Sequence, residues 1–232
     1  MGLKGSLRNV STGVIAIPDS DLTQKAVHRY AIIESSEDTV EDIIGNNDGT
    51  ISGGVTFEDG QGGVGGFVLK SDGNTGNEVA LGNLSGLNSS QSEYTITFWG
   101  KTDGEIDSAY AWGDSSANKF WQIQEDSPQE HAPRAGGQTL STRPSQEANE
   151  WFMATLRFKG GEFDIWIDDD EAGTQSSSVS STDDWDEDAF LLNRSDGERP
   201  WEGWIDDVVY VDEAVNDSDI IDHYNETNAL YD

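Results

Sequence analysis

Two carboxylates in the second half of the chain have the spacing of a catalytic pair. Glu162 and Asp164 lie in a segment whose apolar residues alternate with polar ones, a pattern typical of a strand, so both side chains are expected on one strand face. Glycosidases that retain configuration place two carboxyl groups about 5–5.5 Å apart. However, Asp and Glu supply 45 of the 232 residues, so such pairs also arise by chance. We interpret the pair as a solvated strand face and expect no catalytic residues.

A turn near residue 45 carries side-chain oxygens that could bind a cation. Asp42, Asn46 and Asp48 lie within it, and calcium takes roughly six to eight oxygen ligands from carboxylates, amides and carbonyls. One structural calcium ion is therefore an expectation of the sequence. The alternative is a turn without an ion, because aspartate is abundant along the whole chain.

Several of the eight tryptophans are candidates for stacking on sugar rings. We select the four in or beside predicted loops, which are Trp112, Trp121, Trp185 and Trp201. Trp185 is flanked by acidic residues and is expected to be exposed; its alternative is an indole laid over the sheet edge. Trp99, Trp151 and Trp204 are expected in the core.

The charge of the chain is large and unevenly distributed. The formal net charge is −32. Residues 1–29 hold four basic and two acidic residues, a balance of +2, and the remainder holds 9 basic and 43 acidic residues, a balance of −34. Such self-repulsion strains a compact fold, but at molar salt the Debye length falls to roughly 3 Å. Composition therefore predicts a high-salt environment.

Composition also excludes several classes of protein. The chain has no cysteine, so disulfides and thiolate metal sites are excluded. No apolar run approaches the ~20 residues of a membrane helix, and residues 1–20 contain no apolar core of a secretory signal. The 13 basic residues form no patch beyond the leader, so we expect no nucleic-acid partner.

The elements that must position these residues are mainly short strands separated by Gly, Asn, Asp and Ser. The predicted strands are 29–34, 50–57, 66–70, 77–82, 93–101, 108–113, 119–124, 150–158, 162–168, 188–193 and 201–212. Residues 125–149 and 174–188 are predicted as long loops. One helix is predicted near the end of the chain, capped by Asp217 or Ser218, with Ile220, Ile221 and Tyr224 on one face.

Five segments in order resemble the laminin-G-like, concanavalin A-like jelly rolls. They are 40–50 (VEDIIGNNDGT), 65–79, 94–99 (YTITFW), 150–168 and 203–224 (beginning GWIDDVVY). Asp169 departs from the family pattern, which has glycine at that turn. The resemblance implies an all-β antiparallel sandwich with one short C-terminal helix over residues 28–232. It also implies that Asp206 shares the calcium ion of the first turn.

The leader, residues 1–27, lies outside the resemblance and is predicted to be an extended assembly arm. Lys4 and Arg8 supply its positive charge, and Val14, Ile15 and Ile17 supply a strand that could extend a partner's sheet. A lectin-like fold without an export signal favours a protein assembled inside a cell and released on a particle.

We therefore expect a non-enzymatic decoration, spike or fibre protein on the virion of a haloarchaeal virus. It would bind other virion proteins through the arm, form a homo-oligomer and contact a host surface glycan or glycoprotein. Two alternatives stay open, because the fold hosts many functions: a glycan-binding module of a cellular surface protein, and a degenerate glycanase.

Overall fold

The fold is described from a computed structural model of the chain. The model describes residues 6–10, 13–33, 38–84, 91–104, 106, 108–114, 119–124, 129–136, 138–141, 143–177, 189–194 and 196–231. For residues 6–10, 13–16 and 114 it describes the backbone alone.

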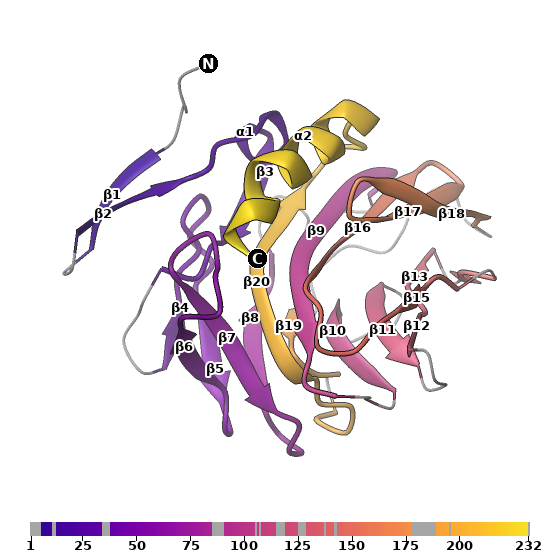
Figure 1. Cartoon of the computed structure of the whole chain (residues 1–232). Helices are drawn as coiled ribbons and strands as arrows, with labels where there is room; N and C mark the ends of the chain where they lie inside the picture. The colour runs from indigo at the N-terminus through magenta and orange to yellow at the C-terminus, as the bar shows by residue number, and fades with distance from the viewer. Residues whose placement is uncertain are drawn as a thin grey trace.

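Two antiparallel sheets form the body of the protein (Figure 1). The first, which we call the helix-side sheet, contains in spatial order β18 (Asp170–Ser176), β17 (Glu162–Ile167), β16 (Phe152–Lys159), β9 (Glu93–Thr102), β20 (Glu202–Val211), β7 (Phe67–Asp72) and β6 (Thr56–Asp59). The strand β3 (Ala26–Tyr30) pairs with the second half of β20.

The second sheet packs against the first. Its spatial order is β14 (Gln138–Thr139), β13 (Arg134–Ala135), β11 (Phe120–Gln124), β10 (Ala109–Asp114), β19 (Ala189–Leu191), β8 (Glu78–Gly82), β5 (Gly49–Ser52) and β4 (Thr39–Val40). Two further short strands, β12 (Gln129–His131) and β15 (Ser145–Gln146), extend from β11. The all-β sandwich is confirmed.

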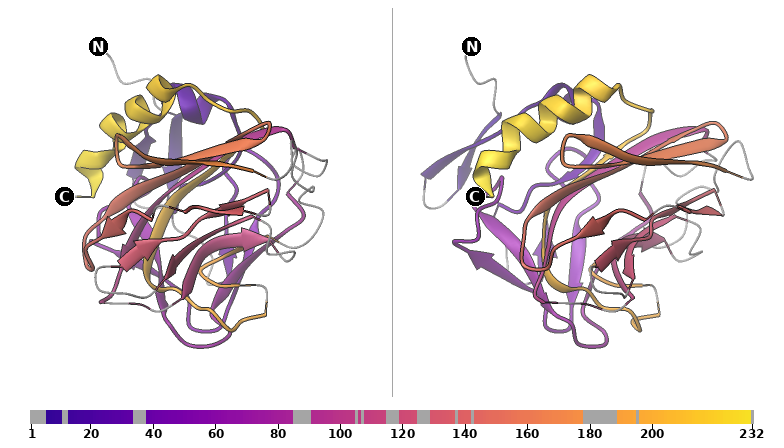
Figure 2. Two further views of the ribbon diagram at one scale, coloured as in Figure 1. Left: turned by 90° about the vertical axis from the view of Figure 1, so that its right-hand side faces the viewer. Right: turned by 45° about the vertical axis from the view of Figure 1, so that its right-hand side comes forward.

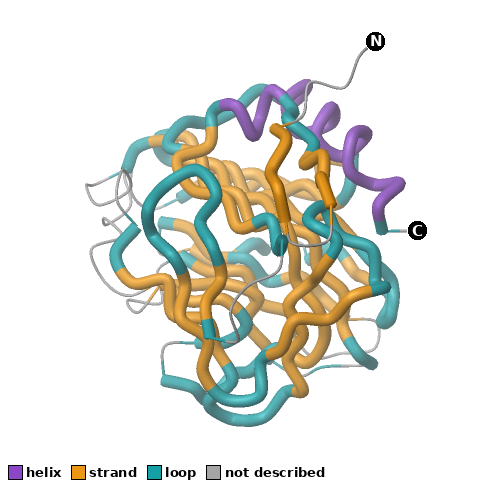
Figure 3. The backbone as a smooth tube through the Cα atoms, turned by 90° about the vertical axis from the view of Figure 1, so that its left-hand side faces the viewer, coloured by secondary structure: helices purple, strands orange, loops and turns teal. Residues whose placement is uncertain are grey.

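A third layer covers the outer face of the helix-side sheet. The helices α1 (Asp21–Gln24) and α2 (Asp217–Thr227) and the 3₁₀ turn η1 (Asn228–Leu230) form it, and Figures 2 and 3 show both helices on one side of the strands. The sheet is therefore buried on both faces. This explains why β20 is buried at every position after Glu202 instead of alternating between buried and exposed residues.

The alternation in β17 determines which residues enter each layer. Phe163 and Ile165 belong to the core between the two sheets, whereas Trp166 belongs to the core beneath the helices. The same alternation of side chains in β9 places Phe98 in the core between the sheets and Trp99 in the core beneath the helices.

The structure divides the predicted arm 1–27 into two parts. Among the described strands, β1 (Ser6–Val10) and β2 (Gly13–Ile17) pair only with each other, and this hairpin projects from the body in Figure 1. From Ile17 onward the chain packs on the body, because Ile17 and Leu22 are buried in the core beneath the helices. Ser20 caps α1 by accepting a hydrogen bond from the backbone N–H of Thr23.

The C-terminal helix is confirmed, with a different cap. Its N-cap is Asn216, whose backbone N–H donates to the Asp219 carboxylate at 3.0 Å. Ile220 is fully buried, and Ile221 and Tyr224 pack beside it, as the apolar face predicts.

Three local predictions were wrong. The predicted strand 50–57 is two strands in different sheets, because the chain turns at Gly53, where φ is +71°. The predicted loop 125–149 contains four short strands, and the predicted loop 174–188 begins with the end of β18. The four strands within 125–149 are polar and only two or three residues long, so they show no hydrophobic alternation from which they could be predicted.

Candidate functional site

A groove of about 390 Å³ lies at the outer face of the helix-side sheet. Its walls come from β9, from the segment before β16, from the turn between β17 and β18, and from the C-terminal residues of the chain. The lining residues are Trp99, Lys101, Asn149, Glu150, Trp151, Asp168, Tyr224, Asn228 and Tyr231.

Four aromatic rings form the base of this groove. Tyr231 stacks on Trp99 with ring centroids 4.2 Å apart and planes 19° apart, and Trp151 meets Tyr231 at 4.9 Å. Tyr224 stacks on the same Trp99 ring at 5.7 Å. The Trp99 indole N–H donates to the Thr227 hydroxyl at 3.1 Å, which fixes its orientation. Trp151 and Tyr224 are half-buried and present ring surface to the groove.

Tyr231 is held in the groove by a buried aspartate. Its hydroxyl donates to Asp206 at 2.8 Å, and the same carboxylate accepts the backbone N–H groups of Ile32 at 3.1 Å and Val64 at 2.8 Å. Burial, reinforced by the neighbouring Asp207 charge, raises the pKa of Asp206 to about 7. The aromatic base is therefore tied to the interior by a fully buried polar contact.

Polar side chains at the rim offer both donors and acceptors. One Asp168 oxygen accepts the Met153 N–H at 2.9 Å, and burial raises the pKa of this carboxyl, as do Asp169 and Asp170. The Asn149 amide oxygen accepts the Gly104 N–H at 3.2 Å, which leaves its NH₂ group as a donor. Aromatic faces with a few convergent polar groups are the usual composition of a small-ligand site.

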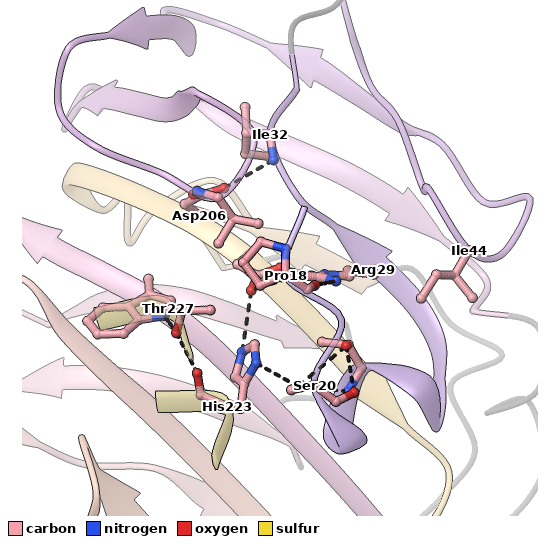
Figure 4. A network of polar contacts seen from close by, with 12 residues as sticks. Pro18, Ser20, Arg29, Ile32, Ile44, Asp206, His223 and Thr227 are labelled. Carbon is pink, nitrogen blue, oxygen red and sulfur yellow. Dashed lines mark hydrogen bonds and ion pairs between the residues drawn. The ribbon is translucent and has the colours of Figure 1, made fainter. Parts of the chain in front are cut away.

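A second polar cluster holds the N-terminal segment, and its Pro18, Ser20, Arg29 and His223 are labelled in Figure 4. Arg29 donates to Asp207 from Nε at 2.7 Å and from Nη2 at 3.1 Å, and from Nη1 to the Pro18 carbonyl at 2.7 Å. The His223 ring lies 3.0 Å from the Ser20 hydroxyl and 3.3 Å from Asp207. Burial alone would raise the pKa of Asp207, but Arg29 and His223 hold it well below its usual range. Since Arg29, Asp207 and His223 are all buried, this cluster is structural.

Comparison with known proteins identifies the family. Residues 72–221, more than half of the chain, match the family model described as the concanavalin A-like lectin/glucanases superfamily. The chain belongs to this superfamily. No curated protein matched the chain.

Solved structures show the same fold at low sequence identity. Domain 4 of the arabinanase AbnA from Geobacillus stearothermophilus, in complex with arabinotriose, is 18% identical, with a TM-score of 0.66 over 85% of this chain and 97% of that one. The binding domain of Paraclostridial Mosquitocidal Protein 1 is 16% identical, with a TM-score of 0.69 over 88% of this chain and 53% of that one. The binding domain of botulinum neurotoxin DC in complex with SialylT is also 16% identical, with a TM-score of 0.65 over 88% and 52%. The chain thus spans almost all of the arabinanase domain and about half of the toxin domains.

Within this lectin-like fold, the predicted calcium ligands make other contacts. Asp42 is buried, lies 2.6 Å from the His28 ring and accepts four backbone N–H groups. Asp48 accepts the Asp42 N–H, Asn46 is exposed, and Asp206 contacts a different set of groups. These occupied oxygens do not fit a shared calcium ion. No group of three or more His, Asp or Glu side chains in the described ranges is placed to hold a metal.

The predicted glycan-binding tryptophans are mostly in the core. Trp112, Trp121 and Trp201 are all 0% exposed, so the prediction that they stack on a ligand was wrong. Adjacent loops suggested surface positions, but Trp112 in β10, Trp121 in β11 and Trp201 just before β20 all belong to the core between the sheets. Trp185 lies outside the described residues. Sequence reasoning missed Trp151 as a site residue, although the polar residues before it were a signal of partial exposure.

The carboxylate pair of β17 is confirmed on one outward face, but Asp164 is not free. Arg157 binds it through two nitrogens, with Nε at 3.0 Å, and also donates to Asp217 at 2.7 Å. These residues line a cavity of about 570 Å³ beside the start of α2, and Glu162 lies at its exposed edge.

None of the helices in the described part of the chain is long and apolar enough to cross a membrane.

Proposed function

We propose that this protein is a non-enzymatic carbohydrate-binding module and that the aromatic groove is its binding site. The observation that carries the proposal is the ring surface of the half-buried Trp151 and Tyr224, which pack on the buried Trp99 and Tyr231 beneath a rim of polar groups. Aromatic faces bury the apolar side of a sugar ring, and the rim bonds its hydroxyl groups. The arabinotriose complex of the arabinanase domain and the binding role named for the toxin domains support the proposal.

The absence of hydrolysis is part of the proposal. A retaining glycosidase needs a free carboxylate on each side of the bond, whereas Asp164 is bound by Arg157. If the degenerate glycanase were correct, the wild type would release reducing sugar and Glu162→Gln would abolish that release. We expect that neither the wild type nor Glu162→Gln releases reducing sugar.

We further propose that the module is displayed on the surface of a virion in concentrated salt. The net charge of −32 suits a medium in which surface repulsion is screened. The β1–β2 hairpin supports an assembly role, because a two-stranded hairpin has unpaired edges that can extend a partner's sheet. Lys4 and Arg8 give this region charge opposite to the acidic body of a second copy or of another virion protein.

Glycan arrays probed at molar salt test the binding proposal. We expect binding by the wild type and its loss in Trp151→Ala. Phe67→Ala, a half-buried aromatic of β7 outside the groove, is the matched control and should bind normally. Binding that survives Trp151→Ala would place the site elsewhere.

Electron microscopy with a labelled antibody tests the display proposal. We expect label on particles, and loss of incorporation when residues 1–16 are deleted while the melting temperature is retained. Label on the host envelope instead would favour the cellular surface protein, and normal incorporation of the deletion variant would exclude the arm.

A further inference from the structure

We infer that the groove selects uncharged polyhydroxylated sugars and rejects sugars that carry a carboxylate or sulfate. This inference rests on the proposed carbohydrate binding and names the ligand class of the same site. It follows from the balance of donors, acceptors and charge around the aromatic base.

The rim presents acceptors and donors in comparable number. Asp168 and Glu150 are acceptors, and the second Asp168 oxygen has no hydrogen bond within the described part of the chain. The Asn149 amide and the Lys101 ammonium are donors. A hydroxyl group both donates and accepts, so neighbouring hydroxyls of one sugar satisfy such a mixed rim. A carboxylate or sulfate group only accepts, so it cannot donate to either acidic group of the rim.

The charge of the groove points the same way. Two carboxylates face one lysine among the lining residues, and Asp169 in the same turn and Asp170 at the start of β18 follow directly. The Lys101 ammonium also lies over the Trp204 ring, with Nζ 5.0 Å from the ring centroid. This cation–π contact lies outside the groove, so the lysine charge is not directed wholly at a ligand in the groove. An anionic sugar would therefore meet net negative charge at contact distance. Salt screens this repulsion only beyond a Debye length of roughly 3 Å at molar concentration.

The rim is also preorganised by the backbone. Asp168 and Asn149 both have positive φ, +58° and +66°, a conformation that Asp and Asn tolerate better than other non-glycine residues. Each is fixed by one hydrogen bond to a backbone N–H. The family pattern has glycine at the position that Asp169 occupies in this turn. Asp169 therefore adds a negative charge that the family pattern lacks.

A matched pair of oligosaccharides tests the inference by titration calorimetry at molar salt. The neutral probe is galactotriose and the anionic probe is trigalacturonate, which differ by the replacement of each hydroxymethyl group with a carboxylate. A printed array of other neutral sugars and their uronate forms extends the comparison. We expect neutral members to bind at least about tenfold more tightly than their uronate forms, the equivalent of about 1.4 kcal/mol.

Two variants assign the selectivity to the rim. Asp168→Asn and Glu150→Gln should each narrow the difference between neutral and anionic probes. Glu162→Gln removes an exposed carboxylate on the same sheet outside the groove and should leave the difference unchanged. Equal or tighter binding of the uronate forms would overturn the inference while leaving the proposed function intact. Failure of every array member to bind would overturn the proposed function itself.

Discussion

The buried ion pair between Arg29 and Asp207 makes a prediction that distinguishes structural charge from surface charge. Arg29 is 3% exposed and Asp207 is 0% exposed. Replacing Arg29 with Met keeps most of the side-chain volume but leaves the Asp207 carboxylate without its cation. It also removes the donor to the Pro18 carbonyl, which holds the N-terminal segment against the body.

The expected loss of stability is large. Removing one partner of a buried ion pair costs about 3–5 kcal/mol, because the other charge stays buried, and the lost hydrogen bond to Pro18 adds about 1 kcal/mol. The double variant Arg29→Met, Asp207→Asn should recover much of this free energy, since no unpaired charge remains and asparagine tolerates the positive φ of this position, +43°. Arg143→Met breaks a partly exposed pair with Glu130 and should cost less than about 1 kcal/mol.

The dependence on pH follows from the low pKa of Asp207 in the folded wild type. A carboxyl whose folded pKa is depressed stabilises the fold above its unfolded pKa, and this contribution is lost as pH falls toward the folded pKa. Without Arg29 the folded pKa rises, because burial then dominates. The deficit of Arg29→Met should therefore be greatest at neutral pH and shrink as pH falls through the raised folded pKa of Asp207 in the variant, which lies above the ordinary pKa of aspartate.

Urea unfolding at constant molar salt, followed by tryptophan fluorescence, measures these differences. A deficit for Arg29→Met no larger than that of Arg143→Met would refute the reasoning. So would a deficit that grows as the pH is lowered from 7 to 4.

Three further predictions concern the groove and the first turn. The pKa of Asp206 is raised to about 7, so its contribution to stability is present below the unfolded pKa and is lost as pH rises through about 7. The urea midpoint of the wild type should therefore fall between the unfolded pKa and pH 7, relative to the midpoint of Asp206→Asn. If the two midpoints change in parallel with pH, the raised pKa is contradicted. A Cβ at Gly62 would lie 2.1 Å from the Leu230 carbonyl oxygen, so Gly62→Ala should displace Tyr231 and weaken glycan binding measured by calorimetry. Gly60 also has a positive φ but open space around it, so Gly60→Ala should leave binding unchanged. Equal losses of binding in the two variants would show that backbone strain alone is responsible. Because the Asp42 oxygens are occupied by His28 and backbone N–H groups, chelator-treated protein should show no calcium-binding heat that Asp42→Asn abolishes, and such heat would restore the calcium site.

Sequence patterns were sufficient where burial enforces a period. The alternation of β17 placed Phe163 and Ile165 in the core between the sheets and Asp164 outside, and the resemblance supplied the antiparallel sandwich with its short C-terminal helix. Patterns were insufficient for β12 to β15, because short polar strands are held by neighbours and not by a hydrophobic face.

The site residues were harder to predict, for a geometric reason. Whether a tryptophan faces a ligand or the core depends on strand parity and on which layer covers the face. Trp112 and Trp151 both adjoin loops, yet Trp112 points between the sheets and Trp151 lies in the groove. Tyr231 carried no signal of its own, since its place depends on a contact with Asp206, 25 residues away in sequence.

The two consecutive aspartates of β20 show what the overall charge conceals. A register shift after Asp206 and the positive φ of Asp207, +43°, turn adjacent side chains toward different partners. Asp206 anchors Tyr231 in the groove, and Asp207 anchors the base of the N-terminal segment through Arg29. In an acid-rich chain both would be counted as adaptation to salt, but burial makes them structural. Since screening acts on exposed charge, lowering the salt should destabilise the acidic surface while leaving the Arg29–Asp207 contribution unchanged, so the deficit of Arg29→Met should be the same at every salt concentration at which the fold persists.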